Sequence, residues 1–342
     1  MQIGNLSAKP GEKVFGFLET SRTMSQLPVH MPVNILCGRE DGPTLLVLAA
    51  VHGAEIVGSL GIGKILREVD PNELKGTLIL VPVANTAGFE FFRRTNAWDD
   101  HDQGMSGMIG GEAPNASPDG TPSQQLAWLY LNELLPQADA VIDIHSGRGT
   151  SYPFYTICTY DPDHEEVYQR SLELAKAFGL REIWRSTPWG PQKPGGFKDV
   201  CNRRGIPYIL PEMGGGPNFL NQGHHLVDLC AQGIKNVMKT MGIMAGEICL
   251  EHDSVDLVDA THTMSTGIRA GFLELQFDRG EFVKKGEIYA KIYHPYTGEL
   301  IDEIRAPGDG YVLNAGQVWP AVGQHVWLAA LSDKIERVSL DD

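Results

Sequence analysis

Histidine and glutamate residues occur in this chain at positions where a hydrolytic metal site would need them. His52 and Glu55 stand three residues apart, in the motif His-Gly-Ala-Glu between an expected strand and an expected helix. Gly53 permits a tight turn, so a loop histidine and a glutamate of the first helical turn can converge. Zinc in hydrolytic sites takes three ligands from His, Glu and Asp and keeps a fourth position for water. A helix-capping glutamate beside an ordinary loop histidine is the alternative interpretation.

A third candidate ligand, His145, ends another apolar segment, in the motif Asp-Ile-His-Ser-Gly. Because side chains alternate along a strand, Asp143 and His145 are expected on the same face. Asp143 could therefore accept the second ring N–H of a metal-bound histidine, which is a common arrangement around metal sites. Alternatively, Asp143 could cap a neighbouring turn.

Glu212 is the candidate general base. It follows Pro211 at the end of a fourth apolar segment. Zinc lowers the pKa of its bound water towards about 7. A carboxylate beside that water can take its proton and pass it to a leaving nitrogen. A turn residue ahead of the glycine run 214–216 is the alternative.

Strands and helices are predicted to alternate through the first two thirds of the chain. We expect buried strands over 44–51, 77–83, 140–144 and 206–210, and helices over 54–69, 124–135, 168–178 and 226–241. Such alternation is typical of an α/β fold whose mostly parallel mixed sheet binds ligands at the carboxyl ends of its strands. His52, His145 and Glu212 each follow an expected strand end, so we expect them to meet at one edge of the sheet.

The composition argues against some classes of function. With 28 basic and 43 acidic residues, the formal net charge is −15, which disfavours binding to nucleic acid and to anionic membranes. The five cysteines are scattered, as is typical of free thiols in a reducing compartment. The sequence begins without a signal-peptide pattern and has no apolar run of about 20 residues. We therefore expect a cytoplasmic protein.

The chain resembles the succinylglutamate desuccinylase/aspartoacylase family of zinc carboxypeptidase-like amidohydrolases. The resemblance covers roughly residues 40–245 and rests on three motifs that match in order and spacing, VHGAE at 51–55, DIHSG at 143–147 and PEMGG at 211–215. It implies a zinc-carboxypeptidase-like sheet with helices on both faces. It also implies one zinc ion per chain, bound by His52, Glu55 and His145, with Glu212 as general base.

The same resemblance suggests further catalytic and substrate-binding residues. In the family an asparagine-proline segment precedes an arginine that stabilises the tetrahedral oxyanion. Asn85 matches the asparagine, although Thr86 replaces the proline, and we expect Asn85 to bind substrate. Arg94, in preference to Arg93, matches the arginine, and preorganised donors at a developing oxyanion are often a large catalytic term. An exposed loop arginine is the alternative.

Asp102 and Gln103 stand where the family has an asparagine-arginine pair that grips a substrate carboxylate. Gln103 cannot form the bidentate charged fork of an arginine, and Asp102 would repel an anion. As substrate-binding residues, the two would favour a cationic or neutral group over a free carboxylate. A solvated loop is the alternative.

The C-terminal part of the chain has a different character. Short alternating segments at 271–277 and 288–293, separated by turns, indicate a small all-β domain. We divide the chain into a catalytic domain, 1–245, and a β-rich domain, 246–342, that resembles a biotinyl/lipoyl-like barrel-sandwich. Its expected hairpin tip, 294–299, has no lysine, so we expect it to cover the active-site mouth or mediate oligomerisation rather than act as a carrier.

The primary functional prediction is a zinc-dependent hydrolase that cleaves the amide bond of a small N-acylated amino acid or related amine. Its partner would be that small-molecule substrate, and assembly into a homo-oligomer is left open. Two alternatives are a metallopeptidase acting on short peptides and a non-catalytic binding protein with a degenerate site.

Overall fold

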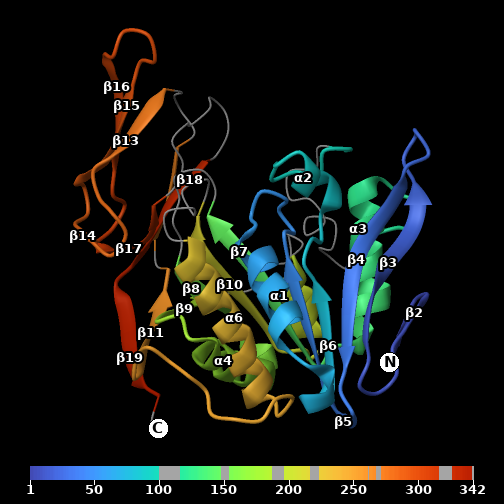
Figure 1. Cartoon of the computed structure of the whole chain (residues 1–342). Helices are drawn as coiled ribbons and strands as arrows, with labels where there is room; N and C mark the ends of the chain where they lie inside the picture. The colour runs from blue at the N-terminus through green and yellow to red at the C-terminus, as the bar shows by residue number, and fades with distance from the viewer. Residues whose placement is uncertain are drawn as a thin grey trace.

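The computed structural model describes residues 1–99, 116–147, 154–186, 196–215, 223–260, 262–266, 271–315 and 326–340 (Figure 1). Asp102 and Gln103 lie outside these ranges, so their assignment stays a prediction.

Within the described residues, one sheet of ten strands forms the body of the protein, in the order β19-β11-β9-β8-β10-β7-β5-β6-β4-β3 (Figure 1). Its centre consists of β5 (Glu40–Ala49), β6 (Lys75–Val81), β7 (Ala140–Gly147) and β10 (Tyr208–Gly215), which run parallel to their neighbours in this group. The flanking strands are β3 (Lys13–Arg22), β4 (Pro28–Cys37), β8 (Phe154–Thr159), β9 (Glu182–Ser186), β11 (Ser254–Asp259) and β19 (Lys334–Ser339).

Antiparallel strands extend this parallel centre on both sides. On one side β4 pairs antiparallel with β6, and β3 pairs antiparallel with β4. On the other side β8 pairs antiparallel with β10, and β19 closes the edge antiparallel to β11. The sheet is therefore mixed, as predicted.

Helices cover both faces of the sheet. The helices α1 (Val57–Glu68), α4 (Glu165–Phe178) and α6 (Gly223–Thr240) lie in front of the sheet in Figure 1. Opposite them, α3 (Pro122–Leu129) and α5 (Phe197–Arg203) contribute to a second core. Alternate residues of β5 divide between the two cores, since Leu45 and Val47 pack with α1 and α6 whereas Leu46 and Leu48 pack with α3 and α5. This confirms the predicted α/β class.

The predicted elements are present, although several boundaries and strands differ. β10 continues to Gly215, so Glu212 lies within a strand rather than after one. The helix expected over 124–135 begins at Pro122 as α3 and ends in a π-helical turn, Tyr130–Leu134. The strands β3, β4, β8 and β9 were missed. β4 and β8 pair with β6 and β10, which lie far from them in the sequence.

The C-terminal part is β-rich, as predicted. It contains a four-stranded sheet, β12-β18-β17-β14, and a three-stranded sheet, β13-β15-β16, among the described residues. Their strands are β12 (His262–Thr266), β13 (Phe272–Leu275), β14 (Phe282–Val283), β15 (Ile288–Tyr293), β16 (Leu300–Arg305), β17 (Gly310–Ala315) and β18 (Val326–Ser332). Two other strands from this part of the chain, β11 and β19, belong to the main sheet. The division at residue 245 stays a prediction.

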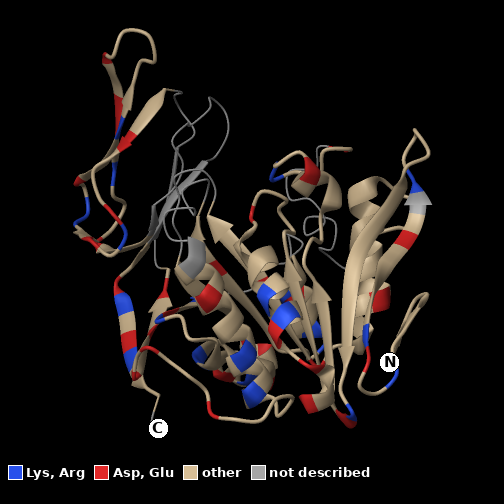
Figure 2. Cartoon of the chain, viewed as in Figure 1, with Lys and Arg blue, Asp and Glu red and all other residues tan. Residues whose placement is uncertain are grey.

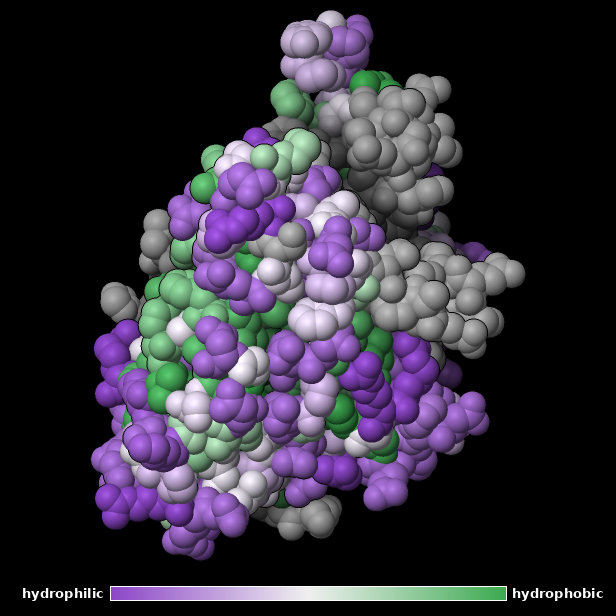
Figure 3. Space-filling view, turned by 90° about the vertical axis from the view of Figure 1, so that its right-hand side faces the viewer, coloured by the Kyte–Doolittle hydropathy of each residue, from purple (hydrophilic) through white to green (hydrophobic). Residues whose placement is uncertain are grey.

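The surface carries charges of both signs. Figure 2 shows them interspersed over the outward faces of α1, α4 and α6. The side that carries β3 and β4 shows apolar surface (Figure 3), and Phe15 and Phe17 of β3 are exposed. Among the described residues, no helix is both long and apolar enough to cross a membrane.

Candidate active site

His52, Glu55 and His145 converge on one point at the carboxyl ends of the central strands. Each side chain offers one potential ligand atom, and these three atoms lie within 4.8 Å of one another. All three residues are buried. His52 Nδ1 is 3.0 Å from Glu55 Oε1, and His145 Nδ1 is 3.1 Å from Glu55 Oε2. The two Nδ1 atoms are 3.1 Å apart. The structure therefore brings together the three residues that the sequence predicted as metal ligands.

A tight turn after β5 sets the first two ligands. Ala50 adopts a positive φ of 49°, which redirects the chain as the strand ends, and the backbone N–H of Glu55 donates to the carbonyl of His52 at 2.9 Å. Gly53 lies against the backbone of Gly88, where an added Cβ would be 2.0 Å from the Gly88 carbonyl carbon. Only glycine fits there, so the turn can bring His52 and Glu55 together.

The third ligand comes from the neighbouring strand β7, which pairs parallel with β5. The backbone N–H of Ser146 donates to Glu55 Oε2 at 3.2 Å and so links the two strand ends. On the other side of its ring, His145 Nε2 lies 3.2 Å from Asp143 Oδ1. The predicted pairing of Asp143 with the far nitrogen of His145 is thus present as an ion-pair contact.

The donor chemistry of this cluster fits a bound cation. A proton on His145 Nε2 faces the Asp143 carboxylate, which leaves a lone pair on Nδ1 of the neutral ring. That lone pair faces His52 Nδ1 and the Glu55 carboxylate. A neutral histidine nitrogen and an ionised carboxylate, the forms that bind metals, are also electron-pair donors without a proton to share. Lone pairs that converge without a proton between them repel one another, whereas a metal ion bound between them would coordinate all three.

The charges around the cluster shift the pKa values of its members. Burial lowers the pKa of His52 to about 4 and so favours the neutral ring that binds metals. Burial also opposes a charge on Glu55, but the two histidines hold its pKa well below its ordinary value. Burial disfavours a charged His145, yet the carboxylates of Asp143 and Glu55 raise its pKa well above the ordinary value.

Glu212 lies beside this cluster with a carboxylate oxygen free for chemistry. It is in register with His145 across the β10–β7 pair, and its Oε2 has no hydrogen-bond partner among the described residues. Burial raises the pKa of Glu212 to about 7, with the nearby charge of His145 acting in the opposite direction. A carboxylate with a pKa near neutrality can both accept and return a proton at physiological pH.

Arg94 reaches the same cluster from the segment that follows α2 (Thr86–Glu90). Its Nη1 donates to Glu55 Oε1 at 2.7 Å, and its buried Nε has no partner among the described residues. The guanidinium thus lies beside the potential metal ligands, where the sequence predicted a donor for an oxyanion. Arg93, by contrast, is exposed, and its backbone N–H donates to the carbonyl of Gly88.

Asn85 has a different environment from the one that the resemblance implied. It is fully buried, its Oδ1 accepts from the N–H of Gly88 as the N-cap of α2, and its Nδ2 donates to the carbonyl of Val51. These bonds tie the start of α2 to the turn that carries His52. Binding of substrate by Asn85 stays a prediction.

Tyr208 is a residue of this region that the sequence analysis missed. Its hydroxyl donates to Asp143 Oδ2 at 2.7 Å, and both residues are buried. The sequence contained a signal for its location, because residues four apart on a strand share one face, which places Tyr208 on the same face as Glu212. The identity of its partner was not accessible, since Asp143 lies 65 residues earlier.

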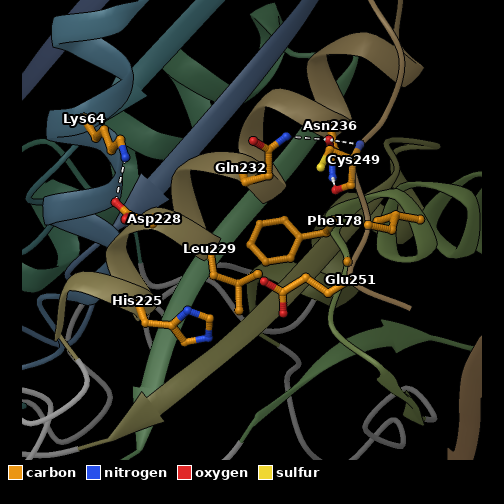
Figure 4. A pocket seen from close by; sticks show the side chains of 11 residues that line it. Lys64, Phe178, His225, Asp228, Leu229, Gln232, Asn236, Cys249 and Glu251 are labelled. Atoms are coloured by element: carbon orange, nitrogen blue, oxygen red, sulfur yellow. Dashed lines mark hydrogen bonds and ion pairs between the residues drawn. The ribbon is translucent and has the colours of Figure 1, made fainter. Parts of the chain in front are cut away.

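A separate cavity of about 290 Å³ lies between α6 and the segment that follows it (Figure 4). Several of its polar groups bond to one another, including Lys64 with Asp228 and Gln232 with Asn236. None of the predicted site residues that the structure describes lines this cavity. The chemistry described above therefore belongs to the edge of the sheet rather than to this cavity.

Solved structures of other proteins share the fold of this chain. The solved structure of the product-bound ectoine utilization protein EutE (DoeB) from Ruegeria pomeroyi matches with a TM-score of 0.81 at 23% identity, covering 96% of this chain and 98% of that chain. A succinylglutamate desuccinylase/aspartoacylase from Rhodobacter sphaeroides matches with a TM-score of 0.79 at 24% identity, covering 98% and 100%. These likenesses confirm the predicted zinc-carboxypeptidase-like fold.

The sequence comparisons bear on the family. N-alpha-acetyl-L-2,4-diaminobutyric acid deacetylase from Halomonas elongata is 27% identical over 312 residues, which cover 90% of this chain and 87% of the deacetylase. Residues 41–240 match the succinylglutamate desuccinylase/aspartoacylase catalytic domain. Since this match spans more than half of the chain, the protein belongs to the succinylglutamate desuccinylase/aspartoacylase family.

Proposed function

We propose that this protein is a zinc-dependent hydrolase that cleaves the amide bond of a small N-acylated amino acid or a related amine. The observation that carries the proposal is the convergence of His52, Glu55 and His145 beside a Glu212 carboxylate oxygen that has no partner among the described residues. Two imidazoles and one carboxylate are the ligand set of several catalytic zinc sites, which keep one position open. Membership of a family of deacylating enzymes supports the same reaction.

His52, Glu55 and His145 would hold the metal, and Asp143 would orient the ring of His145. When bound, zinc supplies a Lewis acid that polarises a carbonyl group and acidifies a water molecule. The Nε2 of His145 faces Asp143, and its Nδ1 faces Glu55 in the ligand cluster.

The remaining steps belong to side chains of the chain itself. Glu212 takes a proton from the attacking water as the new C–O bond forms, and its pKa of about 7 suits that transfer at neutral pH. Arg94 donates to the carbonyl oxygen as negative charge develops there. Glu212 then returns the proton to the amide nitrogen, the C–N bond breaks, and the products are a carboxylic acid and an amine.

The substrate class follows from the relatives and from one departure in the sequence. The Halomonas elongata relative deacetylates N-α-acetyl-L-2,4-diaminobutyric acid, which is an N-acylated amino acid with a second amino group. Asp102 and Gln103, in place of an asparagine-arginine pair, favour a cationic or neutral group over a carboxylate at that position. We therefore place this protein's substrate among small N-acyl amino acids and N-acyl diamines.

The experiment that tests the proposal is an assay of acid release from a panel of N-acetyl and N-succinyl amino acids and N-acetyl diamines. The zinc-loaded protein should hydrolyse at least one compound, and a chelator should abolish that activity until zinc is restored. Hydrolysis of short unmodified peptides in preference to the panel would favour a metallopeptidase instead. Stoichiometric zinc without hydrolysis of any compound would favour a binding protein.

We also propose the division of the chain into a catalytic unit, 1–245, and a β-rich unit, 246–342. Arg279, from the second unit, forms an ion pair with Glu182 of β9 and donates to the carbonyl of Phe154 at the start of β8. Because Tyr155 of β8 pairs with Glu212, this contact fixes the β-rich unit beside the strand that borders the general base. A role in covering the active site fits that position.

A further inference from the structure

The Asp143 carboxylate is buried and has few close polar partners among the described residues. It is 1% exposed, and Val141, two residues earlier on the same face of β7, packs in the core that α3 and α5 form against the sheet. A buried carboxylate is stable only where hydrogen bonds or opposite charges compensate its lost hydration. Within the described residues, its close polar neighbours are the Tyr208 hydroxyl, at 2.7 Å, and the His145 ring, at 3.2 Å.

The two oxygens of Asp143 have different partners. Oδ2 accepts from the Tyr208 hydroxyl with a short hydrogen bond, whereas Oδ1 faces His145 Nε2 at ion-pair distance without the geometry of a well-aligned hydrogen bond. The better bond is therefore the one to tyrosine. Since a carboxylate is planar, fixing Oδ2 fixes where Oδ1 lies, and through it the orientation of the imidazole.

The strand register makes this arrangement rigid. Tyr208 begins β10 and pairs with Val141 of the parallel neighbour β7, two residues before Asp143. Side chains two residues apart on a strand share a face, so the tyrosine ring can extend along the sheet from Val141 towards Asp143. The ring itself is 4% exposed and packs in the same core. Its hydroxyl thus has one position from which to donate.

We propose that Tyr208 is a positioning residue for the metal centre, which acts through Asp143 to hold His145 in its metal-binding orientation. The proposal deepens the proposed function and rests on it for the identity of the metal. Groups that orient metal-bound histidines typically change metal affinity or activity by about 10–100-fold when removed. Tyr208 is separated from the metal site by one more hydrogen bond than Asp143 is, so we expect an effect near the lower end of that range.

The test is the affinity of the metal-free protein for Zn²⁺, measured by competition with a chromophoric chelator. Tyr208→Phe should weaken binding about tenfold and also alter the visible absorption spectrum of the Co²⁺-substituted protein, because the imidazole ligand is less constrained. Tyr130→Phe is the matched control, since it removes an equally buried hydroxyl whose partner is the Cys201 sulfur at 3.3 Å. That control should bind Zn²⁺ like the unmodified protein.

A double-mutant cycle separates positioning from a general loss of packing. If Tyr208 acts through Asp143, Tyr208→Phe should change the Zn²⁺ affinity less than about twofold in an Asp143→Asn background. Unchanged affinity in the single variant, or the same tenfold loss in both backgrounds, would overturn the proposal. Both measurements are independent of turnover, so a protein that binds Zn²⁺ but hydrolyses no N-acyl compound would contradict the proposed function while leaving this inference intact.

Discussion

Replacement of Glu212 by glutamine tests the proposed chemistry most directly. The substitution keeps the shape of the side chain but removes the group that accepts a proton. General-base catalysis typically contributes about 10²–10⁴-fold, so kcat/KM should fall by at least about 100-fold. Zinc content should stay stoichiometric, because Glu212 is not among the three converging ligands. Folding should be preserved as well, since the variant removes a carboxylate whose Oε2 has no partner among the described residues.

The pH dependence of kcat/KM is a second test of Glu212 as the general base. A pKa of about 7 leaves about half of the Glu212 side chains ionised at pH 7 and about a tenth at pH 6. Because the base acts as the carboxylate, kcat/KM should decline as the pH falls through this range. A bound cation favours the carboxylate, so the midpoint of the decline should lie at or below pH 7.

The assay is steady-state hydrolysis of the best N-acyl substrate from pH 5 to pH 8, with zinc content and thermal unfolding measured alongside. Glu90→Gln, on the exposed end of α2, is the control for a glutamate lost elsewhere, and its profile should match that of the unmodified protein. Activity of Glu212→Gln within tenfold of normal, or an unchanged acid limb in that variant, would refute the assignment of Glu212 as the base.

Two further predictions concern the metal and the packing of α1. His145→Ala should lose stoichiometric zinc after dialysis, and full occupancy by elemental analysis would show that the ligand set is wrong. Gly61→Ala should lower the free energy of unfolding by about 1–3 kcal/mol, because the added Cβ would lie 2.4 Å from the Cys230 sulfur of α6. Gly63→Ala on the same helix meets only a flexible side chain at 3.4 Å and should be neutral or stabilising by up to about 1 kcal/mol. Equal unfolding midpoints in denaturant would contradict the packing argument.

The convergence of His52, Glu55 and His145 was predictable from the sequence because its signals are local. The VHGAE and DIHSG segments each combine an apolar strand with polar residues at its carboxyl end, and the ends of neighbouring parallel strands meet at one edge of a sheet. The spacing of Asp143 and His145 likewise follows from strand geometry. Both features can be predicted once the strands are taken to be parallel, without knowing the order of the strands in the sheet.

Features that depend on remote pairing were not predictable in this way. The position of Glu212 inside β10 depends on β8, which pairs antiparallel with it and extends the strand past Pro211. The hydrogen bond from Tyr208 to Asp143 depends on the register between β10 and β7. β3 was missed for a local reason. The residues between β3 and β4 carry no strong turn signal, and the exposed Phe15 breaks the expected pattern of buried apolar residues.

The charges that surround the ligand cluster give an independent argument for a divalent cation. Glu55, Asp143 and Glu212 are three carboxylates, and Arg94 is a permanent cation that donates to Glu55 and lowers the pKa of Glu212. With neutral imidazoles and ionised carboxylates, these groups have a formal charge of −2, in a buried setting where uncompensated charge is strongly unfavourable. Asp143 and Glu55 raise the pKa of His145 well above its ordinary value despite burial, which reflects that excess of negative charge. A divalent cation bound by His52, Glu55 and His145, as proposed above, would balance this charge.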